Sequence, residues 1–103
     1  MERIIQLKEF LAANPRDRFL QHALALEYIK IGDDAKARSL FEEILTDDPG
    51  YIGSYYHLAK LLERAGESAL AIRWFEKGMA AAKAAGDNHA YNELHTAYED
   101  LLY

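Results

Sequence analysis

The chain has 103 residues, a net charge of −5, half of its residues apolar and no cysteine. We expect a single domain over 1–103 with its own core, and the lack of cysteine excludes disulfides, thiolate metal sites and cysteine nucleophiles. Neither half is basic, because residues 1–49 carry 7 Lys/Arg against 10 Asp/Glu and residues 50–103 carry 5 against 7. This balance argues against binding to nucleic acid or to an anionic membrane surface.

Apolar residues recur three and four positions apart in six segments, which predicts six amphipathic helices. In the first helix, Ile4, Leu7 and Leu11 form one stripe with Phe10 beside them. The connections are turns of two to four residues, so we expect neighbouring helices to be antiparallel. No segment has the pattern of a strand. In chain order the expected helices cover about 2–13, 17–31, 34–47, 51–65, 68–84 and 87–102.

Helix-breaking residues mark the ends of these segments in chain order. Pro15 ends the first helix, because proline disfavours helical geometry at the preceding residue, and Pro49 ends the third. Gly32, Gly66 and Gly86 follow the second, fourth and fifth helices, where glycine suits the left-handed conformation that closes a helix. The third helix is expected to begin at a capping aspartate, either Asp33 or Asp34.

Residues 15–48 and 49–82 repeat one another at a spacing of 34. They share 8 identities, where chance would supply roughly two or three. A period in this range is typical of a solenoid built from one supersecondary unit used repeatedly. The identical pairs are Pro15/Pro49, Leu24/Leu58, Ala25/Ala59, Gly32/Gly66, Ala35/Ala69, Ala37/Ala71, Phe41/Phe75 and Glu42/Glu76.

This unit resembles the tetratricopeptide repeat, a pair of antiparallel helices named A and B. The resemblance rests on leucine, small and aromatic residues at the spacing of that family, namely Leu24, Ala25, Tyr28, Ala37 and Phe41 in the first unit and Tyr55, Leu58, Ala59, Leu62, Ala71 and Phe75 in the second. It implies an all-α superhelix with two full repeats, 15–48 and 49–82. A lone N-terminal helix, 1–14, and a C-terminal capping helix, 87–102, would flank them.

The chain departs from the repeat pattern at four positions. Gln21 lies where a large apolar residue is usual, and Gly78 replaces an alanine within a helix at a cost of about 1 kcal/mol in helix propensity. Lys83 stands where the second repeat would end in proline. His95 fills the small-residue position of the last helix, so we expect no further repeat to dock tightly there and interpret this helix as a cap.

The resemblance also implies a function, because in this family the A helices line a concave groove that holds a protein segment. The side chains expected there are apolar, aromatic, imidazole, amide and basic, which suits an extended peptide with an acidic group or a C-terminal carboxylate. The bases could instead be ordinary residues of helix C-terminal turns, which the helix dipole favours. The expected groove residues are Phe19, His22, Leu26, Lys30, Tyr56, His57, Lys60, Arg64 and Asn92.

Other functions find little support in the sequence. His22 and His57 could approach one another, but two ligands make a weak metal site, and there is no nucleophile motif or phosphate-binding loop. We therefore expect a non-catalytic adaptor without cofactor or metal. The alternative is a structural module that forms a homodimer through its terminal helices or through Leu101–Tyr103.

The sequence also bears on location. Its first residues lack a basic segment followed by a long apolar run, so no secretory signal is visible. No apolar run approaches the roughly 18 residues that span a bilayer. These observations favour a cytoplasmic protein.

Overall fold

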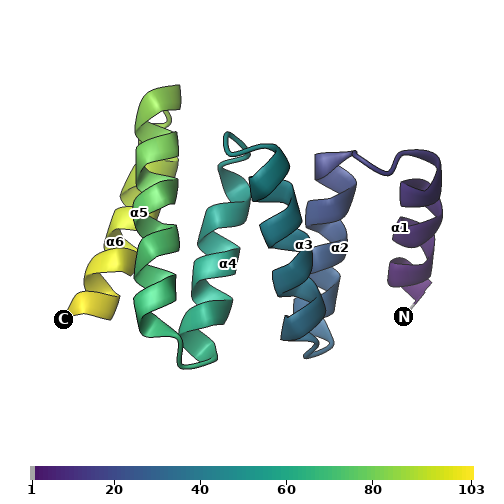
Figure 1. Ribbon diagram of the computed structural model, residues 1–103, viewed down its shortest axis with the longest axis horizontal. Coiled ribbons are helices and arrows are strands. Elements are labelled where there is room, and N and C mark those ends of the chain that lie inside the picture. The colour runs from purple at the N-terminus through teal and green to yellow at the C-terminus, as the bar shows by residue number, and fades with distance from the viewer. Residues whose placement is uncertain (1) are drawn as a thin grey trace. The chain divides into compact units, whose positions relative to one another are not determined.

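A computed structural model describes residues 2–103, and these residues form six α-helices and no strand (Figure 1). The expected all-α fold is confirmed, with each helix packed against its neighbour along the chain inside two compact units. The first unit ends at Asp47 and the second begins at Asp48. The helices are α1 (Glu2–Ala13), α2 (Arg18–Lys30), α3 (Asp34–Asp47), α4 (Gly53–Arg64), α5 (Ser68–Ala85) and α6 (Asn88–Leu102).

In the first unit, α2 packs against both α1 and α3. Ala25 on α2 and Ala37 on α3 are completely buried, and their small side chains allow the two helices to approach closely. The turn between them contains Gly32 with a φ of 82°, in the left-handed region. The Asp33 side chain accepts a hydrogen bond from the Lys36 amide at 3.2 Å, so Asp33 is the cap of α3.

Two sequence expectations about helices need correction. Phe10 does not join the buried stripe of α1 but is 55% exposed, because it lies about 100° around the helix from Leu11. The fourth helix begins at Gly53 instead of residue 51. The preceding residues form a turn, in which the Tyr51 amide donates a hydrogen bond to the Asp48 carbonyl at 3.0 Å.

The second unit contains α4, α5 and α6, with α5 packed against both of the others. Leu58, Phe75 and Leu94 give each helix a large, buried apolar side chain. Gly86 adopts a φ of 71° after α5, and the Asp87 side chain accepts a hydrogen bond from the Ala90 amide at 3.0 Å to begin α6.

Gln21 is polar at a position where the repeat pattern has a large apolar residue. Its side chain makes a hydrogen bond to a proline carbonyl, and the equivalent residue of the second unit makes the same kind of bond. Its side chain is only 3% exposed, and its Nε2 donates to the Pro15 carbonyl at 3.1 Å while its Oε1 accepts from Arg18 at 2.9 Å. At the equivalent place in the second unit, the Tyr55 hydroxyl donates to the Pro49 carbonyl. Glutamine therefore replaces the larger residue because it satisfies the same proline carbonyl.

Gly78 also has a packing reason that the sequence did not reveal. A Cβ atom added to it would lie 2.7 Å from the Cβ of Tyr55 and 3.1 Å from the Cδ1 of Leu94. Glycine therefore allows α5 to approach α4 more closely than any other residue would. The first unit has Ile44 at the equivalent position, where the helix opposite carries Gln21 in place of tyrosine.

Candidate functional site

In the first unit, the exposed face of α2 carries three of the expected groove residues. Phe19, Leu26 and Lys30 lie seven and four positions apart, which places them on one side of the helix. Phe19 is 69% exposed, a large fraction for an aromatic side chain, while Leu26 is half-buried. The Lys30 Nζ lies 3.0 Å from a Glu27 carboxylate oxygen, an exposed ion pair within the helix.

His22, the fourth residue expected on this face, lies three positions after Phe19 and four before Leu26, so it shares their side of α2. Its ring meets the edge of the Phe41 ring from α3, with centroids 5.5 Å apart and an interplanar angle of 64°. Phe41 is completely buried and His22 is half-buried. His22 therefore lies at the edge of this face, where α2 meets α3.

In the second unit, four expected residues gather on one face of α4. Tyr56, Lys60 and Arg64 are spaced by four positions and His57 lies three positions before Lys60, so all four lie within about 100° of the helix surface. The Tyr56 and His57 rings are perpendicular, with centroids 5.7 Å apart. The Lys60 Nζ lies 3.3 Å from a Glu63 carboxylate oxygen, so this base, like Lys30, has an acidic partner on its own helix.

The electrostatics of His57 connect α4 with α6. Partial burial lowers the pKa of His57 below its usual 6.5, a nearby Glu93 carboxylate acts to raise it, and the Arg64 guanidinium acts to lower it. Burial is the largest of these effects, so the imidazole is neutral at pH 7 and has one donor and one acceptor nitrogen.

Glu93 is a residue that sequence reasoning missed, and it changes the character of this face. It lies on α6 next to Asn92, the ninth expected groove residue, and both are exposed. The expected groove residues include the bases of α4 but no acid of α6. The signal was available, because Glu93 directly follows Asn92 on the same predicted helix. The face is therefore mixed in charge, with bases on α4 and an acid on α6.

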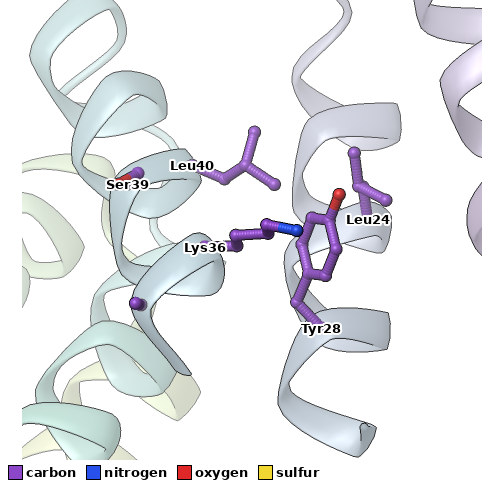
Figure 2. Close-up of a pocket in the computed structure, with 6 residues that line it drawn as sticks. Leu24, Tyr28, Lys36, Ser39 and Leu40 are labelled. Carbon is purple, nitrogen blue, oxygen red and sulfur yellow. The ribbon is translucent and has the colours of Figure 1, made fainter. Parts of the chain in front are cut away.

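A pocket in the first unit is a second feature that the sequence did not predict. It lies between α2 and α3 and has a volume of about 380 Å³ (Figure 2). Its Leu24 and Tyr28 are on the side of α2 opposite Phe19 and Leu26. The lining residues are Leu24, Tyr28, Ala35, Lys36, Ser39 and Leu40.

Residues 2–103 offer neither a cluster of metal ligands nor a membrane-spanning helix. Within that range, no group of three or more His, Cys, Asp or Glu side chains is placed to hold a metal ion. Across the same residues, no helix has both the length and the apolar character that crossing a membrane requires.

Comparison with known proteins identifies relatives on the basis of sequence and structure. No family model matches the chain. The TPR repeat-containing protein PA0015 of Pseudomonas aeruginosa is 30% identical over 88 residues, which cover 85% of this chain and 84% of that protein. The solution structure of a tetratricopeptide repeat domain protein from Salinibacter ruber is 38% identical with a TM-score of 0.81, over 84% of this chain and 88% of that one.

A further structural relative is protein BPP2914 from Bordetella parapertussis, 27% identical with a TM-score of 0.83 over 96% of this chain and 86% of that one. None of these names is that of an enzyme. Tetratricopeptide repeat proteins are typically non-catalytic and serve, as a class, as protein-interaction modules. On the identity and coverage of the Pseudomonas relative, and on the likeness of the solved structures, the chain belongs to the tetratricopeptide repeat family.

Proposed function

We propose that this protein is a non-catalytic adaptor that binds a segment of a partner protein on the exposed faces of its A helices. In this proposal α2 and α3 form the first repeat, α4 and α5 form the second, and α6 is the A helix of the C-terminal cap. The observation that carries the proposal is the exposure of Phe19, 69%, on the same side of α2 as Leu26. Exposed aromatic and aliphatic side chains that adjoin one another are typical of interaction surfaces.

The chemistry of α4 supports a partner segment with an acidic group. Tyr56 offers an aromatic surface with a hydroxyl, and Lys60 offers a charge-assisted hydrogen bond. The pair of Lys60 with Glu63 is about one-third exposed on each side, and such pairs contribute only about 0–1 kcal/mol. A ligand carboxylate can therefore replace Glu63 as the partner of Lys60 at little cost. Glu93 on α6 adds an acceptor for a donor group of the same segment.

The test begins with peptides selected against the immobilised protein from a displayed random library. Binding of a selected peptide is measured by fluorescence anisotropy with the native protein and with Tyr56→Ala/Lys60→Ala. The proposal predicts a loss of about tenfold or more, because truncated tyrosines at binding surfaces often cost more than 1 kcal/mol. The matched control is Lys83→Ala/Tyr103→Ala, which changes the same residue types at exposed positions and should leave binding unchanged. If Tyr56→Ala/Lys60→Ala binds the peptide as tightly as the control variant does, the proposal is refuted.

Self-association is a second candidate function, and the exposed C-terminal side chains favour it. Leu102 is 42% exposed and Tyr103 is 96% exposed. Analytical ultracentrifugation over a range of protein concentrations distinguishes the two functions. The adaptor proposal predicts a monomer at all concentrations. A dimer that disappears when residues 101–103 are deleted would favour the second candidate.

A further inference from the structure

The pocket between α2 and α3 has the walls of a binding site for an apolar group. Leu24 and Tyr28 from α2 and Leu40 from α3 line it, and Figure 2 shows Lys36 extending from α3 toward the Tyr28 ring. Its volume of about 380 Å³ lies near the lower end of the range for ligand pockets. It can hold one aliphatic side chain with part of the backbone that carries it.

Two ammonium groups converge on the aromatic wall of this pocket. The Lys36 Nζ lies 5.5 Å from the centroid of the Tyr28 ring, and the Lys8 Nζ from α1 lies 5.9 Å from it. Lys36 also lies 3.6 Å from an Asp33 carboxylate oxygen. Lys8 forms no ion pair with any carboxylate of residues 2–103. Lys36 lines the pocket, whereas Lys8 and Asp33 lie beside it. Taken together as the rim, these two lysines and one aspartate are positive, in a chain whose net charge is −5.

The combination of apolar walls and a positive rim defines the ligand. We propose that this pocket is a second binding site, which holds an aliphatic side chain of an acidic protein segment whose carboxylates pair with Lys8 and Lys36. A purely apolar partner would leave Lys8 without an anion and Lys36 with Asp33 alone, and a basic partner would be repelled by the two ammonium groups. The site is separate from the proposed A-helix surface, because its α2 residues lie on the opposite side of the helix from Phe19 and Leu26.

The experiment uses a blocked pentapeptide with a central leucine and two glutamates on each side. It is titrated to millimolar concentration into the ¹⁵N-labelled protein, and binding is followed by amide chemical shifts. We expect concentration-dependent shifts at Tyr28, Lys36, Ser39 and Leu40. The same peptide with glycine in the centre should bind at least about threefold more weakly, because burial of the leucine side chain is lost. A peptide with lysines in place of the glutamates should give no shifts at these residues.

The role of the two lysines is tested with Lys8→Gln/Lys36→Gln. This variant should bind the acidic peptide about three- to tenfold more weakly, the effect of two exposed charge pairs. The matched control is Lys77→Gln/Lys83→Gln on α5, which removes the same charge. It also removes a lysine that lies over an aromatic ring, because the Lys77 Nζ is 4.6 Å from the Trp74 ring centroid. Its binding should equal that of the native protein.

Three results would overturn the inference. One is the absence of shifts at the pocket amides, and another is equal binding by native protein and Lys8→Gln/Lys36→Gln. The third is a set of shifts at these amides on simple dilution of the protein, which would make a second copy of the chain the occupant. Shifts confined to Phe19, Leu26 and Tyr56 would reject this pocket while supporting the proposed function, so the two failures are distinguishable.

Discussion

Replacing Gly78 with alanine sets two physical effects against one another. Alanine is more stable than glycine within a helix by about 1 kcal/mol, so propensity alone predicts a more stable protein. The packing predicts the reverse, because the new Cβ would lie 2.7 Å from the Cβ of Tyr55. That atom is bonded directly to the backbone of α4, so a rotation of the tyrosine side chain cannot relieve the overlap.

The expected size of the effect follows from this geometry. Inserting a methyl group into a packed core costs about 1–3 kcal/mol, and an overlap that moves a helix belongs at the upper end of that range. After subtraction of the gain in propensity, we expect Gly78→Ala to lower the free energy of unfolding by about 1–2 kcal/mol. The melting temperature should fall by roughly 5–15 °C.

The assay is urea unfolding followed by far-ultraviolet circular dichroism. The matched control is Ala80→Gly, the reverse exchange at an exposed position of the same helix, α5. It measures the propensity difference without the overlap and should lower stability by about 1 kcal/mol. If Gly78→Ala instead raises stability by the amount that Ala80→Gly lowers it, the close approach of α4 and α5 is refuted.

Three further predictions concern buried polar groups. Gln21→Ala should lower the free energy of unfolding by about 0.5–1.5 kcal/mol, because it removes the hydrogen bond from the buried Gln21 side chain to the Pro15 carbonyl, and a urea midpoint equal to that of the native protein would contradict this. Tyr55→Phe removes only the equivalent hydroxyl and should cost about 0.5–1.5 kcal/mol by the same assay, whereas no loss would show that the hydroxyl bond contributes nothing. The pKa of His57, measured by NMR titration, should lie below 6.5. It should fall further in Glu93→Gln and rise in Arg64→Gln. A pKa above 6.5 in the native protein would contradict burial as the largest effect. Because the folded-state pKa is the lower one, the His57 contribution to stability is full above about pH 6.5 and is lost as the pH falls through the folded value.

The positions of the helices could be predicted because local chemistry decides where they end. Gly32 and Gly66 have φ values of 82° and 81°, a backbone region that glycine adopts without strain. Asp87 caps α6 as its place before an apolar period suggests. Each such signal involves only three or four consecutive residues, so it can be recognised from the local sequence alone. The six expected segments therefore match the six helices.

The candidate site was less predictable because it depends on neighbours from other helices. His22 has a groove position in the repeat pattern, but its ring packs on Phe41 from α3. The effect of Glu93 on His57 requires α6 to lie near α4. From the sequence, Gly78 could be assigned only the loss of helix propensity. Its packing role could not be predicted, because Tyr55 comes close to Gly78 only in the folded chain. Each of these features depends on a distance between residues far apart in sequence.

The most direct test of the central claim is a map of where a partner segment contacts the protein. A display-selected peptide is titrated into the ¹⁵N-labelled native protein, and every amide is followed by NMR. The claim predicts the largest chemical-shift changes on the exposed faces of the A helices, at Phe19, Leu26, Tyr56 and Lys60. In Tyr56→Ala/Lys60→Ala, the shift changes of the α4 residues should disappear. Shifts confined to α3, α5 or Leu102 and Tyr103, with the A helices unchanged, would contradict it.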